Sequence, residues 1–179
     1  MSTIDFGNPD VIVIGAGNAA SCAALAARES GAKVIMLEAA PLDDCGGNSR
    51  YTAGAVRIVF NGADDLAQLY EITDDERKTC DYGTYTEEQY FDDMGRITNY
   101  RTDPDLCEIL VKRSFETMVW MRKKGVKFQA PYGRQAFKVD GKFKFWGGLA
   151  CETWGGGPGL IELEHKACAR EGIPIYYET

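Results

Sequence analysis

Hydrophobic residues fall in short runs along the chain, separated by glycine-rich turns and helix-forming stretches. Residues 10–14 (Asp-Val-Ile-Val-Ile) form a β-branched run without a polar break, which predicts a strand buried on both faces. Alanine-rich sequence follows from Asn18 to Ser30, and Gly31 stands where a glycine would end that helix. A second apolar run covers residues 33–37. Strand, turn, helix and strand make a βαβ unit, in which a right-handed crossover sets the two strands parallel.

The middle of the chain has a different pattern, a loop followed by mostly helical sequence. Residues 41–60 are predicted to be a loop, and residues 61–125 to be mostly helical. Thr86 and Gln89 form a capping box that opens a helix over residues 87–98. Asp103 followed by Pro104 is the typical start of a second helix. We expect its packed apolar stripe to consist of Leu106, Ile109, Leu110, Met118 and Val119.

The last part of the chain returns to the pattern of the first. Alternating residues around Asp140-Gly141 predict a β-hairpin over residues 137–145. The glycine-rich residues 155–159 lead into a helix that runs through Glu171, and residues 173–177 predict a third strand. We therefore expect an α/β fold that starts with a βαβ unit, has a parallel sheet and carries a mostly helical insertion. A sheet of three strands leaves edges uncovered, so we expect a fragment or a reduced version of a larger protein.

This pattern divides the chain into three segments. They are residues 1–60, with the βαβ unit and a second glycine loop; residues 61–154, with the helical and hairpin insertion; and residues 155–179, which return to the first domain.

Composition narrows the function. The chain has 179 residues and a formal net charge of −7, which argues against a nucleic-acid partner because phosphate binding needs clustered positive charge. No apolar run approaches the ~18 residues of a transmembrane helix, and the N-terminus lacks the pattern of an export signal. Six scattered cysteines and one histidine indicate no metal site. We expect reduced thiols and a cytoplasmic protein.

One motif carries the chemistry. Gly15-Ala16-Gly17-Asn18-Ala19-Ala20 fits the G-x-G-x-x-A pattern between a strand and a helix. Gly15 would permit the tight turn, Gly17 would let a diphosphate approach the backbone, and Ala20 would let the helix pack on the strand. The N-terminus of the helix offers free N–H groups to the phosphates. The motif therefore predicts a dinucleotide site rather than a turn that serves packing alone.

Two further features extend this site. Glu38 follows Gly17 by 21 residues and ends the second strand, where a carboxylate can accept both ribose hydroxyls and would repel a 2′-phosphate. A second glycine cluster starts at Gly46 and Gly47, supplies Asn48 and Ser49 as hydrogen-bonding side chains, and ends in Ala53 and Gly54, whose backbone could lie against a flat ring. From these residues alone, NAD and FAD both remain open, and the second cluster could equally be a surface turn.

Together, residues 11–20, Leu37-Glu38-Ala39 and residues 46–54 resemble the N-terminal flavin domain of the fumarate reductase/succinate dehydrogenase flavoprotein superfamily. Within it, residues 46–55, with Phe145-Trp146-Gly147-Gly148 and residues 155–160, are most similar to the tricarballylate dehydrogenase group. The resemblance spans residues 10–179 and would be only about the first third of a typical member.

The resemblance implies an FAD enzyme that oxidises or reduces the C–C bond of a small carboxylic acid by hydride transfer at flavin N5. Tricarballylate, fumarate-like acids and a step in corrin synthesis are the substrates it leaves open. It also implies a separate electron-transfer protein. The cofactor-binding residues that it indicates are Gly15, Gly17, Asn18, Ala19, Ala20, Glu38, Ala39, Gly46, Gly47, Asn48, Ser49, Ala53 and Gly54.

The chain departs from the superfamily in two ways. Arg50 and Tyr51 stand where membrane-bound relatives attach FAD to a histidine, so FAD is expected to bind noncovalently. The proton-shuttling arginine of the superfamily belongs to later sequence, so no catalytic residue is assigned here. The alternatives are a cofactor-binding module without activity of its own and an NAD enzyme.

The remaining candidates have simpler interpretations. His165 is interpreted as a solvated or capping residue of its helix, and Cys45 as structural, although a nearby dipole could lower its pKa. Trp146 and Trp154 are interpreted as core aromatics.

Overall fold

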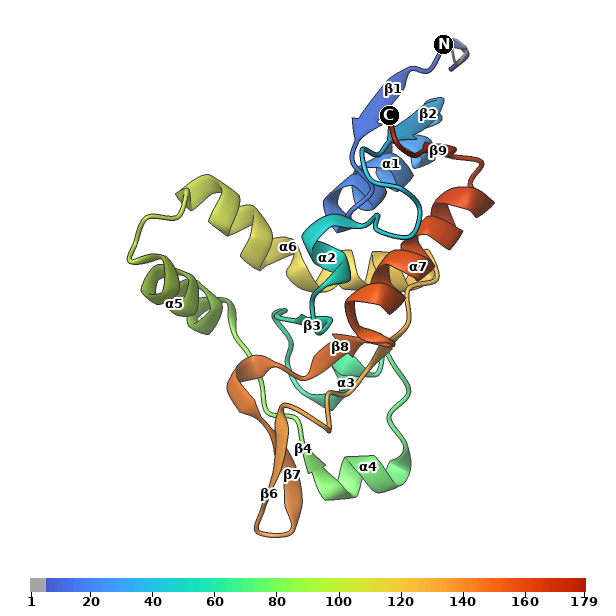
Figure 1. Ribbon diagram of the computed structural model, residues 1–179. Helices are drawn as coiled ribbons and strands as arrows, with labels where there is room; N and C mark the ends of the chain where they lie inside the picture. Colours follow the sequence, from blue (N-terminus) through green and yellow to red (C-terminus); the bar gives the residue numbers. More distant parts are fainter. Residues whose placement is uncertain (1–5) are drawn as a thin grey trace. The chain divides into compact units, whose positions relative to one another are not determined.

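Three parallel strands form the sheet of the first structural unit in the computed structural model, which describes residues 6–179. The strands β1 (Val11–Ile14), β2 (Val34–Leu37) and β9 (Ile175–Tyr176) pair in the order β1-β2-β9 (Figure 1). Val11 pairs with Val34 and Met36 with Ile175. The predicted parallel sheet and the three predicted strands are confirmed.

This unit is discontinuous in sequence. It contains the chain up to Gly54, residues Lys124–Val126 and Gly155–Thr179, while the second unit contains Ala55–Lys123 and Lys127–Trp154.

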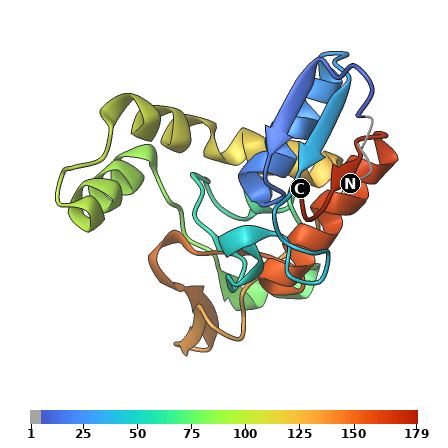
Figure 2. The same cartoon turned by 45° about the horizontal axis from the view of Figure 1, so that its top comes forward.

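Two helices pack in the first unit. The helix α1 (Asn18–Glu29) lies on β1 and β2, and it also packs against α7 (Gly156–Arg170) (Figure 2). The small buried residues of α1, Ser21 and Ala24, permit this close packing. Both helices end within a residue or two of their predicted ends.

The central strand is the buried one. Val34, Ile35 and Met36 of β2 are at most 5% exposed, whereas Ile12 and Ile14 of β1 are 53% and 77% exposed. The prediction that β1 is buried on both faces is therefore wrong. Side chains alternate along a strand, and only one face of β1 packs on α1.

The segment predicted as a loop, residues 41–60, contains two short elements. A single turn of helix, α2 (Gly47–Arg50), starts after Gly46, whose φ of 107° is left-handed. The strand β3 (Ala55–Val56) follows and belongs to the second unit. A four-residue helix leaves too few positions for a periodic signal in the sequence.

The second unit holds two small sheets and four helices. One sheet has the order β3-β8-β5, with β5 (Phe128–Gln129) and β8 (Cys151–Thr153); the other has the order β4-β7-β6, with β4 (Cys80–Asp81), β6 (Ala136–Val139) and β7 (Lys142–Phe145). The helices are α3 (Ala63–Leu66), α4 (Asp74–Thr79), α5 (Glu87–Thr98) and α6 (Pro104–Lys123), and a 3₁₀ turn covers Trp146–Gly148.

Local signals in this unit are confirmed. Thr86 and Gln89 form both hydrogen bonds of a capping box at the start of α5. The Asp103 carboxylate accepts hydrogen bonds from the first N–H groups of α6, from Asp105 and Leu106 at 3.0 Å each. Asp140-Gly141 forms the turn of the β6–β7 hairpin with positive φ at both residues.

Packing in this unit corrects two predictions. The buried face of α6 consists of Cys107, Val111, Ser114, Met118 and Met121. Of the predicted stripe, Leu106, Ile109 and Leu110 are between 45% and 66% exposed, because they lie on other faces of the helix. Trp146 and Trp154 are 67% and 58% exposed and are not core residues. All six cysteines are free thiols, as expected.

Candidate functional site

The glycine turn after β1 has the geometry that its motif predicts. Gly15 has a φ of 104°, a conformation that strongly favours glycine, and its N–H donates to the Leu37 carbonyl at 2.7 Å. Gly17 precedes α1 with an ordinary φ of −82°. A Cβ on Gly17 would lie only 3.2 Å from the Gly46 carbonyl oxygen. Gly17 therefore provides space, whereas Gly15 provides backbone freedom.

The second glycine loop lies directly beside this turn. The backbone N–H of Asn18, the first residue of α1, donates to the Ser49 hydroxyl at 3.3 Å. Gly46 is buried, and Ser49 is half-buried on the turn of helix that follows. Two segments about thirty residues apart in sequence are thus joined at the N-terminus of α1, where free N–H groups favour an anion.

The helix α7 supports this second loop. A Cβ on Gly157 would lie 2.3 Å from the Ser49 carbonyl oxygen and 2.6 Å from that of Arg50. A Cβ on Gly46 would lie 2.9 Å from the side chain of Ile161. This supporting role was not predicted from the sequence, although the glycine-rich residues 155–159 are a signal of close backbone approach.

Glu38 is held at the carboxyl end of β2. Its backbone N–H donates to the Tyr176 carbonyl at 2.8 Å, and its own carbonyl accepts from Thr179 at 3.1 Å. One carboxylate oxygen accepts the Ala40 N–H at 2.8 Å. The side chain is half-buried, and its other oxygen is left to accept hydroxyl groups such as those of a ribose.

The other predicted residues are spread around this centre. Ala20 lies against Gly15, since its Cβ would be 3.9 Å from a Cβ built there. Ala19, Ala39, Gly47 and Asn48 are exposed.

At the end of the second loop, the Gly54 N–H donates to the Thr52 hydroxyl at 3.2 Å. The Ala53 carbonyl approaches Gly156, because a Cβ on that glycine would be 3.4 Å from the Ala53 oxygen. Ala53 is therefore held beside the start of α7, and Gly54 is held by Thr52.

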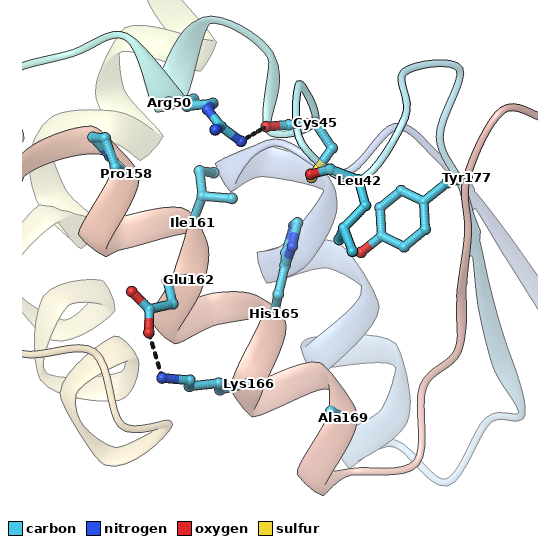
Figure 3. Close-up of a pocket in the computed structure, with 10 residues that line it drawn as sticks. All are labelled: Leu42, Cys45, Arg50, Pro158, Ile161, Glu162, His165, Lys166, Ala169 and Tyr177. Atoms are coloured by element: carbon cyan, nitrogen blue, oxygen red, sulfur yellow. Dashed lines mark hydrogen bonds and ion pairs between the residues drawn. The ribbon is translucent and has the colours of Figure 1, made fainter.

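A cavity of about 490 Å³ lies between this loop and α7. It is lined by Leu42, Cys45, Arg50, Pro158, Ile161, Glu162, His165, Lys166, Ala169 and Tyr177 (Figure 3). The Arg50 guanidinium donates to the Cys45 carbonyl at 3.3 Å. Burial raises the pKa of the Cys45 thiol, although Arg50 acts in the opposite direction. The suggestion that a dipole lowers this pKa is therefore wrong, and Cys45 packs as a buried thiol.

His165 is neither solvated nor a cap. It is half-buried, and its Nε2 lies 2.8 Å from the carbonyl oxygen of Ala16, in the middle of the glycine turn. The interpretation of this residue from the sequence is wrong, because a contact between residues 149 positions apart leaves no local pattern.

A buried carboxyl group lies between α1 and α7. Glu164 is 1% exposed, and its Oε1 lies 3.8 Å from the Cys22 sulfur, which also faces the Asn18 side chain at 3.5 Å. Glu164 Oε2 and the Ser21 hydroxyl have no hydrogen-bond partner within residues 6–179. Burial raises the pKa of Glu164 to about 8, so its neutral form is the main one at neutral pH.

Two further findings concern residues 6–179. They contain no cluster of three or more His, Cys, Asp and Glu side chains that could hold a metal ion. They also contain no helix that is long and apolar enough to span a membrane.

The site as a whole suits a dinucleotide. Two glycine loops meet at the N-terminus of α1, where backbone N–H groups can receive a diphosphate, and a carboxylate ends the neighbouring strand, where a ribose would lie. Comparison with known families shows which dinucleotide this is. The family model described as "FAD binding domain" matches residues 10–179. The chain belongs to the FAD-binding domain family.

This membership selects FAD over NAD, which the residues alone left open. Among curated relatives of this FAD-binding domain, a cytochrome-type fumarate reductase from Shewanella frigidimarina is 32% identical over 116 residues, covering 65% of the chain and 18% of that protein. A urocanate reductase from Eggerthella lenta is 30% identical over 125 residues, covering 70% of the chain and 18% of that protein. The chain thus spans less than a fifth of the length of these relatives.

Solved structures agree on the fold. An open-conformation flavocytochrome c3 fumarate reductase superposes with a TM-score of 0.62 at 25% identity, covering 95% of this FAD-binding domain and 26% of that chain. A 3-ketosteroid dehydrogenase from Rhodococcus jostii RHA1 has a TM-score of 0.62 at 19% identity, a likeness that concerns the fold alone.

Proposed function

We propose that this FAD-binding domain serves a flavin-dependent oxidoreductase that adds or removes hydride at the C–C bond next to a carboxylate of a small acid. The relatives named for fumarate and urocanate support the substrate class. Both of these acids carry a C=C bond conjugated with a carboxylate. The observation that carries the cofactor site of this proposal is the hydrogen bond from Asn18 to Ser49, which joins both glycine loops at the N-terminus of α1.

Named residues of this chain would hold FAD. The Gly15–Gly17 turn and the N-terminus of α1 would receive the diphosphate, and Glu38 would accept the hydroxyls of the adenosine ribose. Asn18 and Ser49, with the exposed Asn48, would surround the middle of the cofactor. The backbone at Ala53 and Gly54 would lie near the isoalloxazine ring.

We propose noncovalent attachment of the cofactor. By resemblance to the flavoprotein superfamily, the attaching histidine of membrane-bound relatives would lie near the second glycine loop, where this chain has Arg50 and Tyr51. The one histidine of the chain, His165, already contacts the backbone carbonyl of Ala16. FAD, once bound, supplies N5 as the position that accepts or donates hydride. The residues of this chain then bind and orient it, and none of them is assigned the transfer of a proton.

The substrate and the electron partner belong to this proposal as well. Tricarballylate is the first acid to test, since the run around Gly46–Gly54 resembles the group that acts on it, and fumarate and urocanate follow from the named relatives. A separate electron-transfer protein would reoxidise or reduce the flavin.

A second candidate is a cofactor-carrying module whose substrate residues lie elsewhere. The observation that favours it is coverage, because the chain corresponds to only 18% of each of two curated relatives.

Purified protein tests both candidates. Under the main proposal it carries flavin absorbance that denaturation releases, its flavin is bleached anaerobically by tricarballylate, or its dithionite-reduced flavin is reoxidised by fumarate or urocanate. A yellow protein that none of the three acids oxidises or reduces would support the module. A colourless protein that does not bind added FAD would overturn both.

A further inference from the structure

Three residues on one face of α7 contact the two glycine loops. Gly157, Ile161 and His165 recur at intervals of four, which places them along one side of a helix. Gly157 meets the carbonyls of Ser49 and Arg50, Ile161 meets Gly46, and His165 meets Ala16. Of these three contacts, the one made by His165 reaches the Gly15–Gly17 turn, and it is a hydrogen bond between the histidine side chain and a backbone carbonyl.

The chemistry of this hydrogen bond is one-directional. A backbone carbonyl can only accept, so the Nε2 of His165 must carry a hydrogen and donate a hydrogen bond to the carbonyl oxygen of Ala16 over 2.8 Å. Ala16 is fully buried, and the first hydrogen bond of α1 runs from Ser21 to the Gly17 carbonyl. The Ala16 carbonyl therefore lies outside the helical ladder, and His165 satisfies a buried acceptor that would otherwise be costly.

The hydrogen bond from His165 to Ala16 also fixes the direction of the next backbone N–H, that of Gly17. Because a trans peptide is planar, the N–H of Gly17 points opposite to the carbonyl of Ala16. A carbonyl held toward α7 by His165 thus directs the Gly17 N–H away from α7. This N–H belongs to the residue whose missing side chain lets a diphosphate approach.

We propose that His165 is a positioning residue for FAD, which holds the Ala16–Gly17 peptide so that the Gly17 N–H faces the cofactor diphosphate. This role rests on the assignment of the Gly15–Gly17 turn to the diphosphate in the proposed function. No contact of His165 with the cofactor is required.

Four variants of the full protein test this role. His165→Leu removes the donor, His165→Gln retains an N–H donor of similar reach, and His165→Asn retains one that is too short. Lys166→Gln alters the exposed neighbour on the same helix as the matched control. The dissociation constant for FAD is measured by flavin fluorescence, the free energy of unfolding without FAD by urea denaturation, and the diphosphate environment by ³¹P NMR of bound FAD.

We expect His165→Leu and His165→Asn to weaken FAD binding roughly tenfold and to shift the ³¹P resonances, because one hydrogen bond orients the binding peptide. His165→Gln should restore most of the affinity, and Lys166→Gln should match the wild type. If the leucine variant does not fold, the difference in FAD affinity between His165→Gln and His165→Asn tests the role of His165.

Equal affinities and unchanged ³¹P spectra in all variants would overturn the role of His165 and leave the FAD site in place. The role would also be overturned if His165→Gln did not recover affinity for FAD and if the Gln, Asn and Leu variants lost the same free energy of unfolding. Such a result would show that His165 has a purely structural role. A wild-type protein without affinity for FAD would instead overturn the site itself.

Discussion

The Ser49 hydroxyl accepts a hydrogen bond from the backbone N–H of Asn18 at 3.3 Å. Asn18 begins α1, and its N–H is among those that a helix cannot satisfy internally. The second glycine loop therefore supplies a partner to the same helix end that receives a diphosphate in this type of fold. The two loops form one binding surface, and changes in either should alter cofactor affinity.

Gly17→Ala should weaken FAD binding at least tenfold while lowering the free energy of unfolding by only about 1 kcal/mol. The backbone of Gly17 is ordinary, so alanine introduces no strain there, but its Cβ would lie 3.2 Å from the Gly46 oxygen and in the path of the diphosphate. Flavin fluorescence titration and urea denaturation measure the two effects. Gly133→Ala, which meets nothing within 4 Å, is the control. Unchanged affinity in Gly17→Ala would contradict the placement of the diphosphate.

Glu38→Ala should weaken FAD binding by roughly tenfold to a hundredfold, because hydrogen bonds from ribose hydroxyls to a charged group are lost. Glu38→Gln should lose less than Glu38→Ala, since one amide oxygen remains to accept from the ribose, although the Ala40 N–H then competes for it. Isothermal titration of apoprotein with FAD measures the change. Asp43→Asn, an exposed acid in the same loop, should bind FAD like the wild type. Equal losses in Glu38 and Asp43 variants would show a general charge effect instead of a ribose contact.

Gly157→Ala should destabilise the protein by roughly 1–3 kcal/mol. Its Cβ would lie 2.3 Å and 2.6 Å from two backbone carbonyl oxygens, which cannot rotate away as a side chain could. Urea denaturation measures the loss as a lower midpoint. A midpoint equal to that of the wild type would mean that α7 does not pack as closely on Ser49 and Arg50 as described.

Glu164 should make the protein less stable as pH rises from 4.5 to about 8. Burial raises the pKa of Glu164 from 4.5 to about 8, so within this window the folded protein holds a proton that the unfolded chain has released. The unfolded state thus binds fewer protons, and the free energy of unfolding falls by roughly 1.4 kcal/mol per pH unit from this group. Above the folded pKa the contribution becomes constant.

Glu164→Gln isolates this effect. The difference in unfolding free energy between wild type and Glu164→Gln should grow in favour of the variant across the window and then level off. The cysteines around Glu164 do not interfere, because burial raises the pKa of Cys22 to about 12 and of Cys168 to about 11. Parallel pH profiles for the two proteins would show that Glu164 ionises in the folded state as it does in the unfolded chain.

Elements whose causes are local can be predicted from the amino-acid sequence alone. The capping box at Thr86, the Asp103 cap and the Asp140-Gly141 turn each depend on a few neighbouring residues, and all three were predicted at the correct positions. The glycine turn at Gly15–Gly17 belongs to the same class, since its strand, turn and helix follow one another directly.

Tertiary structure decided which faces are buried and which distant residues meet. Leu106 and Ile109 are as apolar as any core residue, but they are exposed. The buried face of α6 is the one that contains Val111 and Met118, because that face packs against neighbouring elements. The contacts of His165 with Ala16 and of Gly157 with Ser49 join segments more than a hundred residues apart. Such contacts depend on how helices and loops pack in three dimensions, and no periodicity along one segment encodes them.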